Sequence, residues 1–575
     1  MALNEMEPKT PAFDWRIYIP KSITVIAQEG YSVAGFRADA LAGLTVAIVA
    51  LPLAMAIAIA SGTTPDKGLI TAVIAGFVIS ALGGSRFQIG GPTGAFIVVV
   101  YGVIHTHGYD GLVLATIMAG GMLLIAGILR FGDWIKYIPE PVVTGFTAGI
   151  AVIIFTSQIR DLFGLNMEAA PAEFVAKLEA FWAARHTISL PTVAVAGGAL
   201  ALILALRRFA PKLPGFLIAV GGGAAIVALL QLDVETIGSR FGGVPSALPA
   251  PQFPAVTWER VRELFQPAFT IAFLAGVESL LSAMVADGMT GRRHRSNCEL
   301  VAQGVANIAS GLFGGISATG AIARTATNIR AGAKTPIAGM LHALFVLVFM
   351  LALGPLMAFV PLATLAAVLV VVAWNMSEQE RFRHMLGGPM GDRVVLLATF
   401  ALTVLVDLTV AIEVGIVLAS IIFMHRMAEA TAIEKGVSLI ERDQDDFSVP
   451  GRSAYAARDE LPKGVEMFEL RGPLFFGAAS RLSDAFEAAF PSPKAFILRL
   501  GGVPMIDVSG VGALSRFLKR CETHGTRVLM SELNPSAKSV LERMGALSLA
   551  NVEVFARYED ALERAGSLVR SDSAA

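Results

Sequence analysis

Fourteen apolar stretches, each as long as a whole or a partial membrane helix, follow one another between residues 41 and 424. A helix that crosses about 30 Å of hydrocarbon needs about 20 apolar residues, and several of the stretches reach that length. The composition agrees, because 55% of the residues are hydrophobic, 16% are charged and the mean hydropathy is +0.66. The sequence therefore predicts an α-helical membrane protein with about fourteen transmembrane segments. The stretches are Leu41–Ala60, Gly68–Leu82, Thr93–Ile104, Leu112–Leu129, Val142–Thr156, Leu190–Leu206, Pro214–Leu232, Pro267–Val285, Leu300–Phe313, Gly320–Arg330, Ile337–Leu353, Pro361–Trp374, Val394–Val406 and Val410–Met424.

Two short sequences within this region occur twice at an almost constant spacing. Pro92-Thr93-Gly94-Ala95-Phe96 is echoed 226 residues later by Ala318-Thr319-Gly320-Ala321-Ile322. Thr45-Val46-Ala47-Ile48 is echoed 225 residues later by Thr270-Ile271-Ala272-Phe273. The shared offset predicts two repeats of seven stretches each. An odd number of crossings in each repeat inverts the second repeat relative to the first.

The third and tenth stretches are too short to cross the membrane, and each begins at one of the Thr-Gly-Ala echoes. Interrupted helices at matching positions of two repeats are the best sequence indication of a transporter's binding site. Unpaired N–H groups and the positive dipole end at the start of such half-helices favour an anion. The alternative is that the small residues serve helix packing and that Arg324 only braces its helix. The candidate substrate-binding residues are Thr93, Gly94, Ala95, Gly320, Ala321, Ile322, Ala323 and Arg324.

One acidic residue, Glu278, lies within the otherwise apolar and small-residue segment Thr270–Met284. An acid at membrane depth is costly and is a functional candidate by default. Ser282 lies four residues on, on the same helix face. We therefore predict that Glu278 and Ser282 couple transport to H⁺ or Na⁺, the alternative being a structural carboxyl group. Neither a cofactor nor a metal site is predicted, because His105 and His107 lack a third ligand and no phosphate-binding loop is present.

Lys and Arg residues concentrate in alternate loops, for example at Arg292, Arg293 and Arg295. If the N-terminus is inside, these loops are cytoplasmic, as the positive-inside rule requires. The pattern predicts a multi-pass protein of the plasma (inner) membrane with a cytoplasmic N-terminus and a cytoplasmic C-terminal domain. Three basic residues depart from it, because they fall in predicted external loops: Arg160, Lys177 and Arg185.

After residue 427 the apolar stretches give way to a sequence typical of a soluble domain. Strands are predicted at Val465–Leu470, Ala495–Leu500 and Arg527–Met530, and helices at Ser480–Phe490, Val511–Thr523 and Ser536–Met544. This alternation predicts a small α/β domain. The predicted divisions are an N-terminal segment (1–40), a transmembrane domain (41–427, with repeats at about 41–232 and 267–424), a linker (428–463), the α/β domain (464–566) and a tail (567–575).

Charge and cysteine content narrow the class of protein further. The net charge of −1 gives no support for nucleic-acid binding. Cys298 and Cys521 fall in the two different regions, so a disulfide framework is not expected. We expect membrane lipid and a small anion as partners, and no enzymatic activity.

Several of these motifs resemble the signatures of the SulP anion permease family. They are the block 314–328 (GGISATGAIARTATN), the segment 278–283 (ESLLSA) and the segment 90–94 (GGPTG). The segment 506–510 (IDVSG) resembles the loop-to-helix turn of a STAS domain. The resemblance implies a seven-plus-seven inverted-repeat fold, a core domain that moves against a gate domain as an elevator, and a homodimer. It also implies secondary active transport of an anion bound between the third and tenth helices, with Glu278 at an acidic position associated with ion coupling.

By the same resemblance, Ser509 matches the position that related bacterial regulators phosphorylate, and the STAS domain implies a cytoplasmic partner. Serine is also a favoured helix N-cap, so we expect Ser509 to cap the Val511–Thr523 helix, with phosphorylation as the alternative.

The first functional hypothesis is a proton-coupled symporter of sulfate, a dicarboxylate or a similar small anion, with Glu278 as the proton carrier. A sodium-coupled bicarbonate symporter, with Glu278 and Ser282 as cation ligands, is the nearest alternative. An anion exchanger or channel, a nucleobase permease and a STAS-bearing scaffold are the others.

Overall fold

A computed structural model describes most of the chain, and it divides into two units, Met1–Val417 and Leu418–Ala575, which are described separately. The described residues are 15–134, 137, 139–167, 171, 173–211, 213–245, 247–406, 408–429, 432–435, 461–462, 464–475 and 493–572. The predicted helix Ser480–Phe490 therefore lies outside the described residues.

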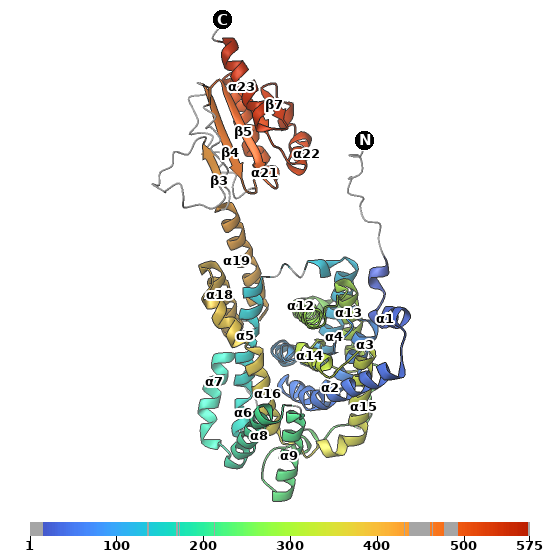
Figure 1. The fold of residues 1–575 in the computed structure, drawn as a ribbon. Coiled ribbons are helices and arrows are strands. Elements are labelled where there is room, and N and C mark those ends of the chain that lie inside the picture. The colour runs from blue at the N-terminus through green and yellow to red at the C-terminus, as the bar shows by residue number, and fades with distance from the viewer. Residues whose placement is uncertain are drawn as a thin grey trace. The chain divides into compact units, whose positions relative to one another are not determined.

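The first unit is helical apart from two very short strands (Figure 1). Its elements are α1 (Lys21–Glu29), α2 (Val33–Ala60), α3 (Pro65–Leu82), β1 (Gly90–Gly91), α4 (Phe96–Ile128), α5 (Glu140–Ser157), α6 (Ile159–Phe163), α7 (Phe174–Ala183), α8 (Leu190–Phe209), α9 (Gly215–Leu230), α10 (Ile237–Phe241), α11 (Trp258–Glu263), α12 (Phe265–Thr290), α13 (Ser296–Leu312), β2 (Thr319–Gly320), α14 (Ile322–Arg330), α15 (Ile337–Met357), α16 (Leu362–Met376), α17 (Gln379–Leu386) and α18 (Met390–Leu405). The helix α19 (Leu408–Glu429) begins in this unit and ends in the second. Short 3₁₀ turns lie at Trp15–Tyr18, Phe131–Asp133 and Ala184–Thr187.

Each of the fourteen apolar stretches overlaps a helix. The third and fourth stretches are the two parts of α4, which is interrupted at Gly108, where φ is +70° and ψ is 178°. Glycine adopts this backbone conformation without the steric cost of a side chain. Among the described residues, nine helices are long and apolar enough to span a membrane, and the break in α4 makes one of them a half-helix followed by a second segment.

The helices of the first unit pack into two groups. The core group is α2, α3, α4, α12, α13, α14 and α15, and the gate group is α5, α8, α9, α16 and α18. Close approach within the core group requires glycine: a Cβ atom on Gly120 of α4 would lie 2.6 Å from the carbonyl oxygen of Gly304 on α13. Packing through small residues is how helices associate where lipid removes the hydrophobic driving force.

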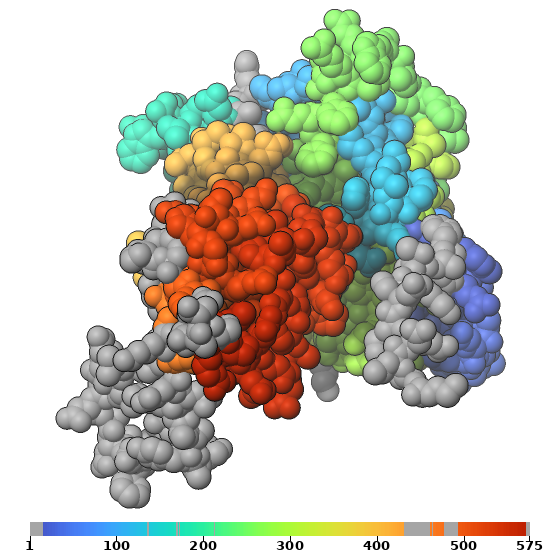
Figure 2. Space-filling view, turned by 90° about the horizontal axis from the view of Figure 1, so that it is seen from above, coloured from blue at the N-terminus to red at the C-terminus, as the bar shows by residue number. Residues whose placement is uncertain are grey.

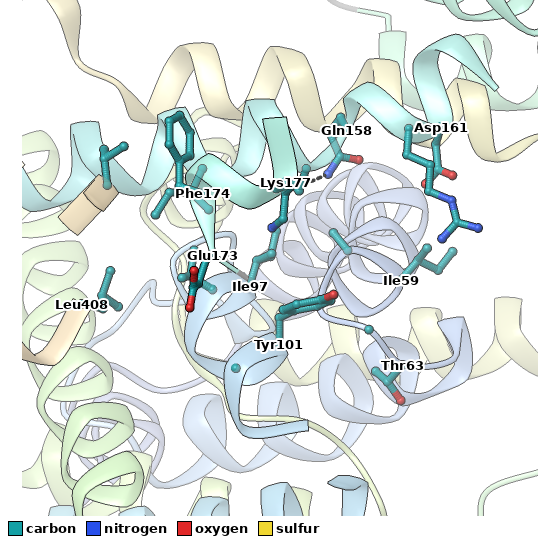
Figure 3. Close-up of a pocket in the computed structure, with 18 of the residues that line it drawn as sticks. Ile59, Thr63, Ile97, Tyr101, Gln158, Asp161, Glu173, Phe174, Lys177 and Leu408 are labelled. Atoms are coloured by element: carbon teal, nitrogen blue, oxygen red, sulfur yellow. Dashed lines mark hydrogen bonds between the residues drawn. The ribbon is translucent and has the colours of Figure 1, made fainter. Parts of the chain in front are cut away.

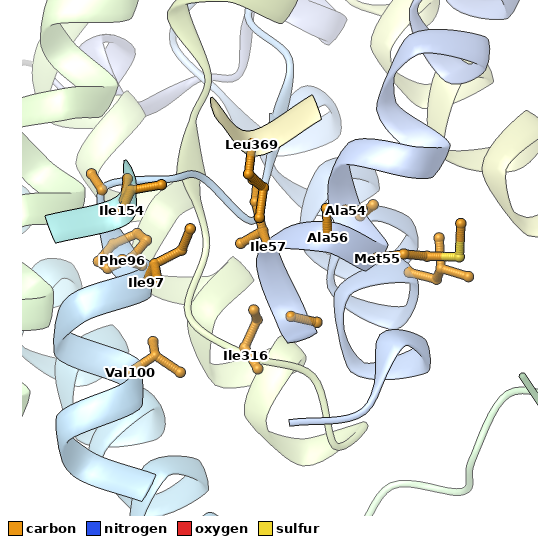
Figure 4. Close-up of a cluster of buried hydrophobic side chains, with 14 of the residues drawn as sticks. Ala54, Met55, Ala56, Ile57, Phe96, Ile97, Val100, Ile154, Ile316 and Leu369 are labelled. Carbon is orange, nitrogen blue, oxygen red and sulfur yellow. The ribbon is translucent and has the colours of Figure 1, made fainter. Parts of the chain in front are cut away.

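A cluster of buried apolar side chains joins elements of both groups (Figure 4). Ile57 of α2 and Phe96 of α4 belong to the core group, whereas Ile154 of α5 and Leu369 of α16 belong to the gate group. Phe96 and Ile154 lie close together in this view. The start of α4 is therefore in contact with the gate group.

The second unit contains a five-stranded sheet with strand order β3-β4-β5-β6-β7. Its elements are β3 (Ala432–Lys435), β4 (Val465–Arg471), β5 (Ala495–Gly502), α21 (Val508–Thr523), β6 (Arg527–Ser531), α22 (Pro535–Arg543), β7 (Val552–Phe555) and α23 (Tyr558–Asp572), with a 3₁₀ turn at Ala546–Ser548. Strand β3 is antiparallel to β4, and the other strands are parallel. Figure 2 shows its described residues, coloured orange to red, as one compact body.

Side chains that alternate along the strands fill two separate apolar layers. Phe468, Phe496 and Val528 pack with α21 and α22 on one face of the sheet. Ile497 and Leu529 pack with Ala561 and Ala565 of α23 on the other face. The α/β class predicted from the sequence is confirmed, while β3, β7 and α23 were not predicted. Strand β3 falls inside the segment predicted to be a linker.

One capping prediction was wrong. The predicted helix Val511–Thr523 begins earlier, at Val508, because Asp507 is its N-cap and accepts a hydrogen bond from the Gly510 N–H at 2.8 Å. Ser509 therefore lies in the first turn of the helix and does not cap it. It is exposed there, beside the exposed Val508.

Candidate functional site

The two Thr-Gly-Ala echoes meet at a short antiparallel ladder between β1 and β2. Gly90 pairs with Gly320 and Gly91 pairs with Thr319. The ladder continues into the next residue, where the Ala321 N–H donates to the Ile89 carbonyl at 2.8 Å. Residues more than two hundred positions apart thus place the beginnings of α4 and α14 beside each other.

The beginnings of these two helices present unpaired backbone donors. Among the described residues, the N–H groups of Gly94 and Ala95 at the start of α4 have no acceptor. The same holds for Ile322 and Ala323 at the start of α14. Both helices also direct the positive end of their dipoles to this place, which favours a negatively charged ligand. The N–H of Ala321, in contrast, is used by the ladder.

The carboxylate of Glu278 on α12 joins the site through Thr93. Glu278 Oε2 accepts a hydrogen bond from Thr93 Oγ1 at 3.0 Å. Both residues are partly exposed, so the carboxylate is accessible from the site. Within the described part of the chain no Lys, Arg or His lies within 4.0 Å of it. An acid without a cation partner is free to bind a proton or a metal cation.

Arg324 of α14 links the two halves of the site through a hydrogen bond to the segment before α4. Its Nη2 donates to the Pro92 carbonyl at 2.9 Å, and the residue is only 3% exposed. A Cβ atom on Gly91 would lie 2.7 Å from its Nη1, so glycine is needed for the guanidinium to pass. The structure does not pair Arg324 with Glu278. Its charge can act on an anion through the half-helices without direct contact.

Ser282 belongs to the frame of the site. Its hydroxyl donates to Thr325 Oγ1 at 3.1 Å, and Thr325 Oγ1 also accepts from the Ile89 N–H at 3.1 Å. Ser282 is fully buried. The bond to Thr325 directs it to α14, so its predicted role as a second cation ligand beside Glu278 has no support in this arrangement.

Three polar residues that the sequence did not single out support the same region. Gln88 Nε2 donates to Ser279 Oγ at 2.7 Å, and Ser279 Oγ donates to Glu299 Oε1 at 3.3 Å. Glu299 also accepts from the N–H groups of Gly84 and Ser85 at 2.9 and 3.0 Å. The sequence signal that could have indicated Glu299 is its position directly before the apolar stretch Leu300–Phe313. Its partners come from a distant loop, which no spacing in the sequence indicates.

The site lies where the core group meets the gate group. A Cβ atom on Gly94 would lie 2.8 Å from Met376 Sδ of α16 and 3.4 Å from Ile154 Cδ1 of α5. Gly94 is therefore in close contact with the gate group.

Comparison with known proteins identifies the chain. The sulfate permease family profile matches residues 36–399, and the STAS domain profile matches residues 457–561. The chain belongs to the sulfate permease (SulP) family. It is therefore a membrane anion transporter with a STAS domain, and not an enzyme.

Two curated SulP relatives cover most of the chain. The putative sulfate transporter YvdB of Bacillus subtilis (strain 168) is 41% identical over 534 residues, which are 92% of this chain and 98% of the relative. The bicarbonate transporter BicA of Picosynechococcus sp. is 30% identical over 498 residues, 84% of this chain and 86% of the relative.

Solved structures agree with the fold. Murine Slc26a9, an anion transporter in the inward-facing state, superposes with a TM-score of 0.85 at 16% identity and covers 98% of this chain and 97% of its own. The transmembrane domain of a cyanobacterial BicA superposes with a TM-score of 0.61 at 30% identity and covers 67% of this chain and 98% of its own. The SulP transmembrane fold and the STAS domain predicted from the sequence are thus confirmed.

Proposed function

We propose that this SulP protein is a proton-coupled symporter that carries sulfate or another small anion. The observation that carries the proposal is the hydrogen bond from Thr93 to Glu278, which joins an uncompensated acid to the beginning of a half-helix. The ligand would occupy the space in front of the free N–H groups of Gly94, Ala95, Ile322 and Ala323.

Electrostatics makes proton and anion binding favour each other. A bound anion and an ionised Glu278 repel each other in a medium of low dielectric constant. Protonation removes this repulsion, so the affinity for the anion rises when Glu278 is neutral, and the affinity for the proton rises equally when the anion is bound. Thr93 is placed to transmit the change, because its hydroxyl donates to the carboxylate and can turn to accept from the protonated acid.

The movement would be that of an elevator. Buried bonds tie β2 and α14 to α12: Thr319 Oγ1 donates to the Ala275 carbonyl at 2.8 Å, and Ser282 binds Thr325. The β1–β2 ladder joins the beginning of α4 to them. The site would therefore travel as one body with the core group. The contacts of Gly94 with Met376 and Ile154 are the ones that must slide.

Sulfate is the first candidate substrate, because the relative at 41% identity is named a putative sulfate transporter. Bicarbonate is the second, because the relative at 30% identity is named a bicarbonate transporter. For bicarbonate, sodium coupling is the alternative, with the oxygens of Glu278 and Thr93 as the cation ligands in place of a proton.

Uptake by proteoliposomes tests the function. Labelled sulfate, bicarbonate and fumarate would each be offered with an inward proton gradient, an inward sodium gradient or neither. We expect sulfate to accumulate with the proton gradient alone. Sodium-dependent accumulation of bicarbonate would select the second candidate. Uptake that ignores both gradients would reject symport in favour of exchange or a channel.

The substitution Glu278→Gln separates coupling from binding. It keeps the hydrogen bond from Thr93 and removes the titrating group, so gradient-driven accumulation should disappear while exchange of internal for external anion continues. Glu259→Gln is the matched control, because Glu259 is an exposed acid on α11. Undiminished uphill uptake by Glu278→Gln protein would reject the proposed role of Glu278.

The membrane orientation is proposed from the charge pattern, and the homodimer and the phosphorylation site from the family resemblance. The protein would be a homodimer in the plasma (inner) membrane with its N-terminus and STAS domain in the cytoplasm. Ser509 would be a phosphorylation site, since it is exposed in the first turn of α21, where a phosphate group is favoured by the helix dipole. Phosphopeptide mass spectrometry of protein from native cells tests this, and an unmodified Ser509 peptide under every growth condition would reject it.

A further inference from the structure

Two of the three basic residues that break the positive-inside pattern line one cavity. The cavity has a volume of about 750 Å³ and is lined by residues of α2, α4, α5, α6, α7 and α10 and by Val404, Leu405, Val406 and Leu408. Arg160 and Lys177 belong to its lining, whereas Arg185 does not. We call it the α4–α7 cavity. It is separate from the site between the half-helices, because none of the candidate substrate-binding residues lines it.

Lys177 is almost completely buried in this cavity. The residue is 5% exposed, and its Nζ lies 5.2 Å from the centre of the Tyr101 ring, with which it makes a cation–π contact. Figure 3 shows the Lys177 side chain reaching from α7 to Ile97 and Tyr101 of α4. Within the described part of the chain its ammonium group has neither a hydrogen-bond acceptor nor an acidic partner. Burial lowers the pKa of Lys177, as expected for an ammonium group that has lost water without gaining an anion.

Among the described residues, Arg160 is a second cation of the cavity lining without an acidic partner. Its Nε is buried and makes no hydrogen bond among the described residues, and no acid pairs with its guanidinium there. Arg160 lines the same cavity as Tyr101, the residue whose ring Lys177 covers.

The other charged groups of the cavity do not neutralise this pair. Arg240 is bound to Asp161 at 3.0 Å and to Glu235, so Asp161 is already used. Glu173 is exposed and forms no ion pair in the described ranges. A buried cation without a partner is costly, and Lys177 is such a cation. Arg160, which is partly exposed, adds a second positive charge to the lining of the same cavity, and a bound anion would offset the cost of burying Lys177.

We propose that the α4–α7 cavity holds a second anion-binding site, in which Lys177 and Arg160 bind one small inorganic oxyanion of the size of sulfate or bicarbonate. A guanidinium group offers paired N–H donors to two oxygens of such an anion, and the ammonium group supplies a point charge. The class of ligand rests on the proposed anion transport, but the site itself rests on the unpaired cations. Because the cavity lies on the predicted outer face, an anion that enters from outside would bind here before it reaches the site between the half-helices.

A cysteine reporter tests the site without measuring transport. The reporter is Gly102→Cys on α4, where a Cβ atom meets no atom within 4 Å, in a full-length chain with the two buried native cysteines replaced (Cys298→Ser, Cys521→Ser). The modification rates by anionic sulfonatoethyl methanethiosulfonate and by its cationic trimethylammonium analogue are compared by intact-protein mass spectrometry. We expect Lys177→Gln and Arg160→Gln each to lower the anionic-to-cationic rate ratio by about tenfold, the lower end of electrostatic steering in a cleft.

Matched variants and added salts decide the interpretation. Lys177→Arg should restore the ratio, and Arg185→Gln should leave it within about twofold, because Arg185 binds the Trp182 carbonyl outside the cavity. Sodium sulfate or bicarbonate at constant ionic strength should slow the anionic reagent in the reporter protein with Lys177 and Arg160 intact.

An unchanged ratio in Lys177→Gln and Arg160→Gln protein would overturn the proposal. So would a changed ratio without protection by either salt, since it would indicate a diffuse field and no binding. Protection without any uptake in proteoliposomes would reject the transport proposal and leave the site standing.

Discussion

The beginnings of α4 and α14 have the same backbone plan and different surroundings. Both carry a Thr-Gly-Ala sequence, and they pair through β1 and β2. Thr93 is partly exposed and binds the accessible acid Glu278, whereas Thr319 is fully buried and donates to the Ala275 carbonyl. One copy of the repeat therefore reaches into the site, and the other is fixed to the scaffold.

The exposure of the third residue after the threonine differs between the two copies in the opposite sense. Phe96 at the start of α4 is 0% exposed and packs in the apolar cluster shared with the gate group, while Ile322 at the start of α14 is 38% exposed. Duplication fixes which backbone groups are presented to the ligand. The elements that pack around each copy then decide which side chains move, which are clamped and which face the site.

The largest expected effect comes from the two glycines of the echo. In Gly320→Ala protein the new Cβ would lie 1.9 Å from Gln88 Nε2 and 2.6 Å from its Cδ, so the buried Gln88 must leave Ser279. Overpacking of about 1–3 kcal/mol and a lost hydrogen bond of about 1 kcal/mol together predict a strongly destabilised protein. In Gly94→Ala protein only the end of the flexible Met376 side chain must give way.

Thermal unfolding of the purified full-length proteins measures this difference. Gly320→Ala should lower the unfolding midpoint strongly or abolish a monodisperse preparation. Gly94→Ala should keep the midpoint within a few degrees and slow transport, because the contact with the gate group tightens. Equal stability of the two variants would show that the second copy, which contains Gly320, is not the copy that is fixed to the scaffold.

The second-largest effect on stability is expected from Phe96 and Ile322, the apolar residues at the beginnings of α4 and α14. Phe96→Ala removes roughly 100 Å³ of buried side chain, and at about 24 cal/mol per Å³ the cavity alone costs about 2 kcal/mol. Ile322→Ala leaves no closed cavity, so its cost should stay within about 0.5 kcal/mol. Unfolding midpoints in one detergent give the comparison. A larger loss for Ile322→Ala would mean that α14 is covered by a partner in the folded protein.

The sequence predicted the backbone of this region better than its side-chain partners. The echo, the short third and tenth stretches and the acid in an apolar segment were sufficient to indicate paired half-helices and Glu278. All fourteen apolar stretches overlap helices, since length and apolar composition are local properties. The α/β class of the second unit followed from local alternation in the same way.

The partners depend on which distant segments meet, and a single sequence does not contain that information. Arg324 binds Pro92, although the sequence left both substrate binding and a bracing role open for it. Ser282 binds Thr325, although spacing placed it on one helix face with Glu278. The cap of α21 is a local feature that was misread, because Asp507 stands two residues before Ser509 and takes the capping role. Lys177 and Arg160 were noticed only as exceptions to a charge pattern, and their common cavity required the fold.

The smallest expected effects belong to the two threonines, and they distinguish the copies most directly. Thr319→Val removes a fully buried hydrogen bond to Ala275 and leaves the carbonyl without that donor, which should cost about 1 kcal/mol in stability. The coupling of transport should persist, because Thr319 does not contact Glu278.

Thr93→Val breaks the bond to Glu278 at a partly exposed position, where water can replace the lost donor. Its stability should be unchanged, while the pH dependence of uptake shifts as the carboxylate loses its donor. Thr93→Ser retains the hydroxyl and is the control that should behave as the unchanged protein does. Unfolding midpoints and uptake measured from pH 5 to pH 8 on the same preparations provide both readouts. If Thr319→Val shifted the pH profile and Thr93→Val did not, the accessible copy and the clamped copy would have to exchange roles, and α14 would hold the coupling residue.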